Sequence, residues 1–220
     1  MRLFSEMKGV EACRRLVKIC MLLMLVLLTG SHPGKIHAAV FRRQGVPYSL
    51  DVWRTKDGLP QSSVLSMVQT RQGYLWMGTL KGLVRFDGHQ FTVMDPGNTP
   101  GLPGTRIFTL FEDSREELWV GTEASGVALI RDGEVVPLDF GRGSRDARVV
   151  AICEDDSGAV WLLAADGQLA RYRDGVFDIW TAVDRRSGSA RALVSRAGGS
   201  VWIGSDRAVL GIGATLGRDR

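Results

Sequence analysis

Cysteine and histidine are scarce in this chain of 220 residues. Of three cysteines, Cys13 and Cys20 lie in the first 38 residues, which leaves Cys153 for the body of the protein. No disulfide can form within that body, so its stability must come from packing. Cys153 stands in an apolar stretch, and we interpret it as a buried, inert thiol rather than a nucleophile.

His89 is the only histidine after residue 38. Because zinc sites need clustered histidine and cysteine ligands, no metal site is predicted.

Catalytic and cofactor-binding motifs are also missing from the sequence. A Ser-His-Asp arrangement would have to use His89, and no nucleophile motif accompanies it. Residues 211–213 (Gly-Ile-Gly) lack the third glycine and the acidic partner of a phosphate-binding loop. Two pairs of adjacent acids, at 116–117 and 155–156, would point to opposite sides of an extended strand. We interpret them as solvated turn charges rather than as general acid-base pairs. The sequence therefore predicts no catalytic residue and no cofactor.

Excess charge of one sign is absent once the N-terminus is set aside. Of 28 Lys/Arg residues six lie in residues 1–38, and of 24 Asp/Glu residues two do, which leaves 22 of each. The body is formally neutral, so a nucleic-acid partner has no electrostatic support. Six arginines gather in two loops: Arg142, Arg145, Arg148, Arg185, Arg186 and Arg191. They could meet an anionic ligand, but nearby aspartates offset their charge and loop solubility is the simpler interpretation.

The chain also lacks an apolar run long enough to span a membrane comfortably. The apolar stretch over residues 19–28 is shorter than the roughly 20 residues that a span needs. It follows a basic stretch ending at Lys18 and precedes a small-residue end at Ala38, which is the order of a secretory signal peptide. We predict a signal peptide over residues 1–38 with cleavage after Ala38, and an uncleaved anchor is the alternative. The mature protein would be periplasmic or secreted.

Helical periodicity is absent after the presequence, and short alternating runs separated by turn residues predict an all-β fold. One phrase, Gly-Tyr-Leu-Trp-Met-Gly-Thr at residues 73–79, recurs in weaker copies. Its tryptophans are Trp76, Trp119, Trp161 and Trp202, with spacings of 43, 42 and 41 residues. A nearly fixed period around forty residues is typical of the blades of a β-propeller.

Each period carries strand and turn signals for one four-stranded antiparallel blade. We predict an incomplete propeller of about four blades over residues 46–212, with no fourth strand visible in the last unit. The repeats lie near residues 64–94, 107–138, 149–181 and 192–212, and residues 213–220 form a frayed tail. Ahead of the first repeat, residues 48–53 alternate as a strand would and residues 56–60 form a turn.

The repeated residues have structural jobs in this interpretation. The tryptophans are large apolar bodies suited to the contact between adjacent blades. The glycine two positions later permits close backbone approach, and the Thr or Ser after it can bond local backbone. These residues are Gly78, Thr79, Gly121, Thr122, Gly204 and Ser205, whereas the third unit has Leu163 and Ala164 there. They mark the scaffold, and no residue is assigned to ligand binding.

Two further features bear on the third unit. Asp156, Gly158 and Trp161 fit the spacing of the Asp-box of sialidase-like propellers, with Glu154 where Ser or Thr would stand. Even a complete box stabilises a turn, so it favours a propeller more than catalysis. Trp180 lies outside the register of the four repeated tryptophans. It is either a core residue of a last strand or a platform for stacking a sugar.

Three motifs resemble the two-component regulator propeller repeat: Asp57-Gly58-Leu59-Pro60, Gly73-Tyr74-Leu75-Trp76-Met77-Gly78-Thr79 and Gly82-Leu83-Val84-Arg85-Phe86-Asp87-Gly88. The resemblance covers roughly residues 48–212. It implies an extracytoplasmic sensor whose propeller has more repeats than are seen here. A β-sandwich, a membrane helix and a histidine kinase or diguanylate cyclase would follow. This chain would then be the non-enzymatic sensor part, with the membrane reached only through a missing downstream segment.

The expected function is the sensing of a small periplasmic ligand, a glycan or another solute, at the propeller face. Two alternatives stay open: a secreted propeller enzyme acting on glycans, and a propeller that serves as a protein-interaction module. Convergent carboxylates or a metal site would favour the enzyme, and signalling without small-molecule binding would favour the interaction module. Because an open set of blades leaves unpaired strand edges, self-association is expected as well.

Overall fold

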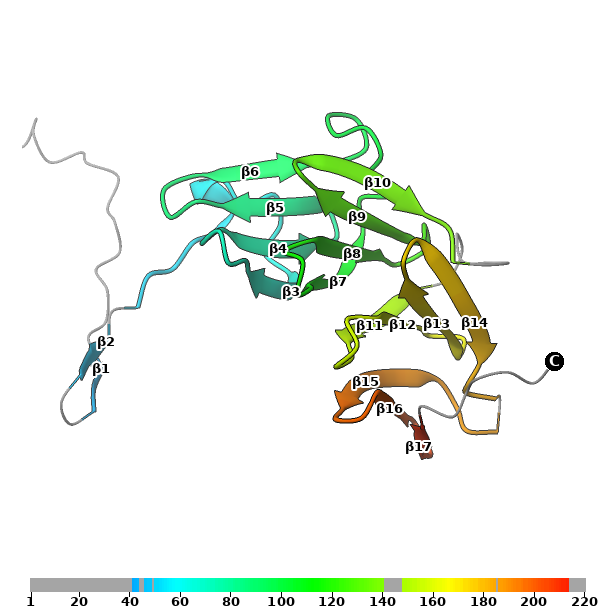
Figure 1. The fold of residues 1–220 in the computed structure, drawn as a ribbon. Helices are drawn as coiled ribbons and strands as arrows, with labels where there is room; N and C mark the ends of the chain where they lie inside the picture. Colours follow the sequence, from blue (N-terminus) through cyan, green and yellow to red (C-terminus); the bar gives the residue numbers. More distant parts are fainter. Residues whose placement is uncertain (1–40, 44–45, 49, 141–147, 185, 214–220) are drawn as a thin grey trace, which may run out of the picture. The chain divides into compact units, whose positions relative to one another are not determined.

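A computed structural model describes residues 41–43, 46–48, 50–140, 148–184 and 186–213 (Figure 1). The predicted signal peptide over residues 1–38 lies outside the described residues, as do Arg142, Arg145, Arg185 and nearly all of the predicted tail. Within the described ranges, no helix is long and apolar enough to cross a membrane. Contacts divide the chain into two units, Met1–Val52 and Trp53–Arg220.

The described part of the first unit contains one hairpin, in which β1 (Phe41–Arg43) pairs antiparallel with β2 (Val46–Tyr48). The strand expected over residues 48–53 is wrong at residues 50–53, which have no strand conformation and are exposed. Alternation alone does not make a strand, since the ladder also needs a neighbouring edge that supplies hydrogen bonds. The turn expected at 56–60 includes a short 3-10 helix, η1 (Thr55–Asp57), capped by Gly58 at φ 107°.

Four antiparallel sheets make up the second unit, and the strands of each follow the order of the sequence. Blade 1 contains β3 (Val64–Gln69), β4 (Leu75–Thr79), β5 (Gly82–Phe86) and β6 (Phe91–Met94). Blade 2 contains β7 (Ile107–Glu112), β8 (Leu118–Thr122), β9 (Val127–Arg131) and β10 (Glu134–Leu138). Blade 3 contains β11 (Val149–Glu154), β12 (Val160–Ala164), β13 (Gln168–Arg173) and β14 (Val176–Thr181). Blade 4 contains β15 (Ala190–Arg196), β16 (Ser200–Ser205) and β17 (Val209–Ile212).

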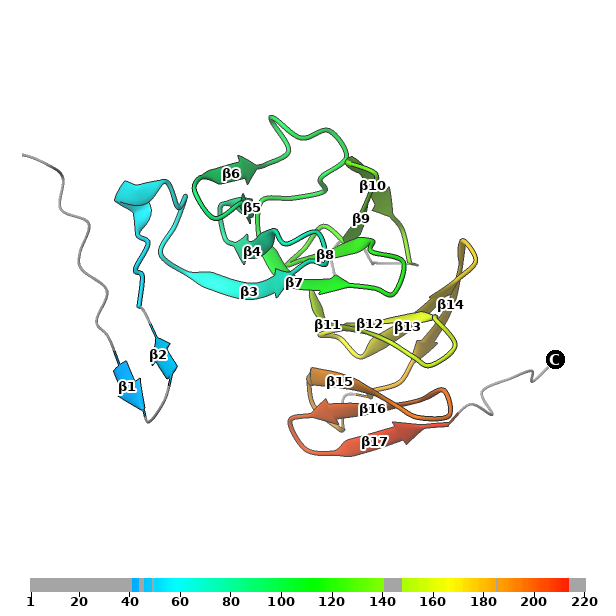
Figure 2. The same ribbon diagram turned by 60° about the vertical axis from the view of Figure 1, so that its left-hand side comes forward.

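The predicted all-β architecture of propeller blades is confirmed. Figures 1 and 2 show the blades following one another, each a meander of neighbouring strands. Three sheets have four strands, and in the described residues the fourth has three. The strands form where apolar and polar residues alternate between Gly-containing turns, as period-two patterning requires.

Hydrophobic clusters lie between consecutive blades. Trp76 packs in a cluster with Ile107 of blade 2, and Trp119 packs in one with Val149 of blade 3. Trp161 belongs to a third cluster together with residues of blade 4. Each of these three indoles is buried, whereas Trp202, on the outward face of blade 4, is 39% exposed. The repeated tryptophan therefore joins its own blade to the next one.

A bulge that the sequence did not signal recurs in the first strand of every blade. The strand register shifts after Val64, Ile107, Val149 and Ala190. In blades 1, 2 and 4 the residue that follows the shift pairs with the repeated glycine, Gly78, Gly121 or Gly204. A bulge bends a strand and increases its twist. The first residue of the next blade, Ile107 or Val149, lies within 3.0 Å of the place where a Cβ on Gly78 or Gly121 would stand.

Candidate functional site

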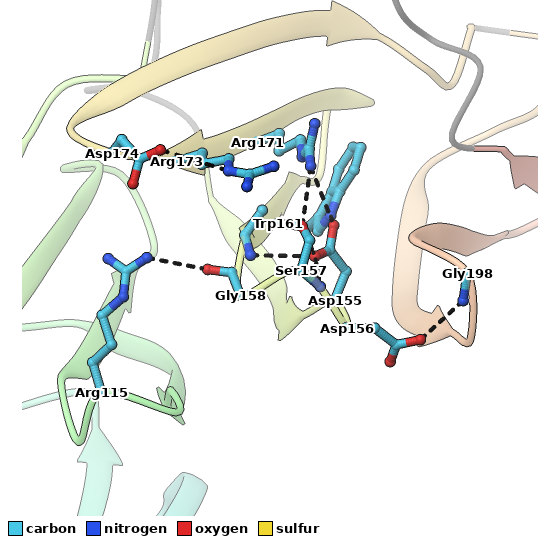
Figure 3. Close-up of polar contacts among 11 residues, drawn as sticks. Arg115, Asp155, Asp156, Ser157, Gly158, Trp161, Arg171, Arg173, Asp174 and Gly198 are labelled. Atoms are coloured by element: carbon cyan, nitrogen blue, oxygen red, sulfur yellow. Dashed lines mark hydrogen bonds and ion pairs between the residues drawn. The ribbon is translucent and has the colours of Figure 1, made fainter.

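The turn between β11 and β12 is organised by one buried carboxylate (Figure 3). Asp155 is only 5% exposed. Its Oδ1 accepts hydrogen bonds from the backbone amides of Ser157 at 2.8 Å and Ala159 at 3.2 Å. Its Oδ2 accepts a bond of 2.8 Å from Nε1 of Trp161. Burial raises the pKa of Asp155, but the hydrogen bonds from Ser157, Trp161 and Ala159 outweigh it, so the pKa lies below its ordinary value.

Blade 2 has the same arrangement around Asp113. Its Oδ1 accepts from the amides of Arg115 at 3.0 Å and Glu117 at 2.9 Å, and its Oδ2 accepts from Nε1 of Trp119 at 2.9 Å. In both blades the aspartate stands six residues before the tryptophan. At that place blade 1 has Thr70 and blade 4 has Arg196, so the motif is confined to the two middle blades.

The interpretation of the adjacent acids as solvated charges is wrong for one member of each pair. Asp155 and Glu117 are buried, whereas Asp156 and Glu116 are exposed. Glu117 forms an ion pair with Arg131. The Asp-box spacing pointed to Asp156, yet its neighbour Asp155 holds the turn and the indole. Asp156 lies in the turn itself, where it is exposed and contacts blade 4 instead.

The turns at this end of the blades are linked in series. The Glu112 carboxylate of blade 2 accepts from the amide of Arg71 in blade 1, at 3.0 and 3.1 Å. Glu154 of blade 3 accepts from the amide of Ser114 in blade 2, at 2.7 Å. The third link is reversed, since Asp156 of blade 3 accepts from the amide of Gly198 in blade 4 at 2.9 Å. Each turn is thereby held against the next blade.

Two clefts open at this end of the blades, and both contain an arginine beside a repeated tryptophan. The first, between blades 1 and 2, has a volume of about 350 Å³ and is lined by residues that include Tyr74, Trp76 and Arg85. The second, between blades 3 and 4, has a volume of about 310 Å³ and is lined by residues that include Trp161 and Arg171. In the strand register Arg85 pairs with Trp76 and Arg171 pairs with Trp161.

In the second cleft the arginine is already engaged. Nη2 of Arg171 donates to Oγ of Ser157 at 3.3 Å and lies 3.7 Å from Oδ2 of Asp155. The guanidinium also lies 5.4 Å from the ring centroid of Trp161. Figure 3 shows these two side chains next to each other. Trp180 stacks on Trp161 with centroids 5.7 Å apart, and it lines the cleft as well. Trp180 thus combines core packing with a half-buried surface that a ligand could reach.

Arg148, Arg191 and Cys153, which the sequence singled out, do not line these clefts. Arg148 forms an ion pair with Glu123 at 2.9 Å, and Arg191 forms one with Asp206 at 2.7 Å. Cys153 packs against the cluster between blades 3 and 4, and burial together with the Asp155 charge raises its pKa to about 12. No group of three or more His, Cys, Asp or Glu in the described part of the chain could hold a metal ion.

The repeated residues have contacts that are local and structural. A Cβ added to Gly121 would lie 2.5 Å from Cγ2 of Thr109 and 2.9 Å from Cβ of Val149. At Gly204 the nearest atom would be Cβ of Ala192 at 3.5 Å. Oγ1 of Thr122 donates to the carbonyl of Gly126 at 2.7 Å. The matching contacts in blade 1 are those of Gly78 with Ile107 and of Thr79 with the carbonyl of Gly82.

Residues 58–81 and 101–124 match the family described as two component regulator propeller. These two stretches are therefore similar to two component regulator propeller repeats. Histidine kinase P4 of Formosa agariphila is 54% identical over 37 residues, which are 17% of this chain and 3% of that protein.

Solved structures share the fold. The extracellular domain described as that of the hybrid two component system BT4673 from B. thetaiotaomicron has a TM-score of 0.60 at 22% identity, over 71% of this chain and 21% of that one. The corresponding domain of BT3049 has a TM-score of 0.57 at 19% identity, over 72% and 21%. Virginiamycin B lyase from Staphylococcus aureus has a TM-score of 0.57 at 12% identity, over 80% and 62%. The chain thus spans about a fifth of the length of the two extracellular domains.

Proposed function

We propose that this protein is a ligand-sensing part of an extracytoplasmic signal-transduction receptor, that it is itself non-catalytic, and that the membrane and output segments belong to a longer receptor. The observation that carries the proposal is the pair of two component regulator propeller repeats at residues 58–81 and 101–124. Extracellular domains of two component systems share its fold, which supports the same assignment. The two clefts give such a sensor places where a small solute fits, because pockets of a few hundred Å³ suit small ligands.

Export is tested with a fusion of the whole chain to alkaline phosphatase, an enzyme that becomes active only outside the cytoplasm. We expect phosphatase activity from the full fusion and none from a fusion that lacks residues 1–38, since those residues are predicted to be the signal peptide. Inactivity of both fusions at equal protein levels would overturn the extracytoplasmic assignment.

Sensing is tested by measuring the Tm of the chain against a panel of oligosaccharides, amino acids and organic acids. A ligand that binds only the folded state raises stability by about 2.7 kcal/mol at a concentration of 100 Kd. We expect at least one class to raise the Tm in a saturable way. A flat response across the whole panel would contradict ligand sensing by this chain.

A further inference from the structure

Arg85 in the first cleft is a half-buried cation that has no counter-ion among the residues that the structure describes. It lies on β5, and its guanidinium is 4.7 Å from the ring centroid of Tyr74 and 5.9 Å from that of Trp76. Within the described ranges, no carboxylate or carbonyl forms a hydrogen bond or ion pair with it. Arg171, its counterpart in the second cleft, forms a hydrogen bond with Ser157 and an ion pair with Asp155. A half-buried guanidinium that stacks on two rings and lacks an anion is suited to receive one from a ligand.

The mouth of the same cleft carries opposite charge. Glu116 and Asp132 both line it, both are exposed, and neither side chain has a hydrogen bond or ion pair to the described residues. Glu112 lines the cleft too, but its carboxylate is taken by the amide of Arg71. The one guanidinium is therefore outnumbered by carboxylates, which disfavours a ligand that carries only negative charge.

Glu116 stands where the other three blades have glycine. Gly73, Gly158 and Gly199 occupy the place three residues before the tryptophan, and all of them have positive φ. Glu116 adopts the same conformation, with φ 64°. A residue with a Cβ is disfavoured there, so the scaffold gains nothing from glutamate at this position. The substitution does place a carboxylate at the mouth of the cleft.

The rest of the lining includes the apolar side chains Met94, Leu118, Ile130 and Val135, beside the polar residues Thr70, Gln72 and Thr99. We propose that the cleft between blades 1 and 2 binds a zwitterionic solute with an apolar body, of the kind of a hydrophobic or aromatic α-amino acid. Its carboxylate pairs with Arg85, its ammonium group faces Glu116 and Asp132, and its side chain lies on the apolar lining. This inference rests on the proposed sensing function, for which it names the site and the class of ligand.

The test uses the full chain and three probes of one shape that differ only in charge: L-phenylalanine, 3-phenylpropionate and 2-phenylethylamine. Isothermal titration at low salt is expected to show one site for phenylalanine, with each single-charge analogue about tenfold weaker or worse, because each leaves one cleft charge unpaired. Binding of 3-phenylpropionate as tight as that of phenylalanine would overturn the zwitterion assignment. Failure of all three probes to bind at millimolar concentration would overturn the site.

Variants locate the two charges. We expect Arg85→Gln to weaken phenylalanine binding by about tenfold or more, with Tm measured alongside to show that the variant folds. Glu116→Gly restores the residue that the other blades carry, so it should fold at least as well and still weaken binding several-fold. Asp174→Asn, at the matching hairpin of blade 3, is the control and should leave affinity unchanged.

Unaltered affinity in Arg85→Gln would refute the assignment. If phenylalanine fails but another solute in the panel raises the Tm, this cleft assignment falls while the sensing function stands.

Discussion

Asp113 and Asp155 each satisfy two kinds of donor with one side chain. One carboxylate oxygen accepts from the amides of a tight turn, and the other accepts from the indole of the tryptophan that faces the next blade. Both carboxylates are buried, so each donor would otherwise lie away from water without a partner. The aspartate therefore couples the shape of the turn to the orientation of the indole between blades.

Asp155→Asn is expected to lower the free energy of unfolding by about 1–3 kcal/mol near neutral pH, because a buried charged acceptor is lost. The pKa of Asp155 is lowered in the fold. Its contribution is therefore complete above the unfolded value of about 3.9 and is lost as the pH falls through the folded value. Urea unfolding at pH 7 and at successively lower pH should show the difference between wild type and variant shrinking. Asp174→Asn, an exposed site in the same blade, is the control. A difference that grows with acid would contradict this account.

The contact between neighbouring blades is built from three parts: a tryptophan, a glycine two residues later and the bulged first strand of each blade. Gly121 of β8 lies against Val149, which begins β11 of blade 3. In blade 3, Leu163 takes the place of the glycine and joins the cluster with blade 4. The position two residues after the tryptophan can therefore hold a glycine, which lets the next strand approach closely, or a larger side chain that packs against the next blade.

Gly121→Ala and Gly204→Ala form a matched pair at the same place in two blades. In blade 2 the added Cβ would be 2.5 Å from Thr109 and 2.9 Å from Val149, both rigid β-branched residues. In blade 4 its nearest neighbour would be 3.5 Å away, which is ordinary contact. We expect chemical denaturation to show a loss of about 1–3 kcal/mol for Gly121→Ala and a change within about 0.5 kcal/mol for Gly204→Ala. Equal losses of unfolding free energy in the two variants would show that close backbone approach is not the reason for glycine at this position.

At the scale of the whole molecule, two apolar faces have no blade against them in the described residues. Met67 on β3 is 62% exposed, whereas Leu110 and Ile152, at the same register of blades 2 and 3, are 8% and 9% exposed. Trp202 and Val194 are exposed on the outward face of blade 4. We propose that the isolated chain associates with itself through these faces and the strand edges beside them, since exposed apolar faces and unpaired edges both favour association.

Light scattering coupled to size exclusion is expected to show a mean mass that rises with protein concentration. Met67→Glu places a charge on one outer face and should lower the association constant by about tenfold or more, because burying an unpaired charge is costly. Val176→Glu serves as the control, since Val176 is equally exposed but lies at the start of β14. A monodisperse monomer at all concentrations would argue against association.

The sequence by itself determined where the strands lie and how they repeat. Alternation between turn glycines marks each strand of the four blades, and the spacing of Trp76, Trp119, Trp161 and Trp202 divides them into sheets. Such signals are local or periodic, so a single chain displays them without knowledge of what meets in space. The same logic failed at residues 50–53, where the pattern is present but no partner strand lies beside it.

The tertiary structure alone decided which polar groups become buried and which stay free. Asp155 and Asp156 are neighbours in the sequence, yet one is enclosed by a turn and an indole while the other reaches the next blade. Arg85 and Arg171 stand opposite equivalent tryptophans, yet among the described residues only Arg171 has a hydrogen bond and an ion pair. Asp156 meets Gly198 across a blade contact, 42 residues along the chain. Asp155 and Arg171 find their partners within blade 3. The repeat period places these residues at matching positions of the blades. Which of them become buried and which become paired follows only from the packed structure.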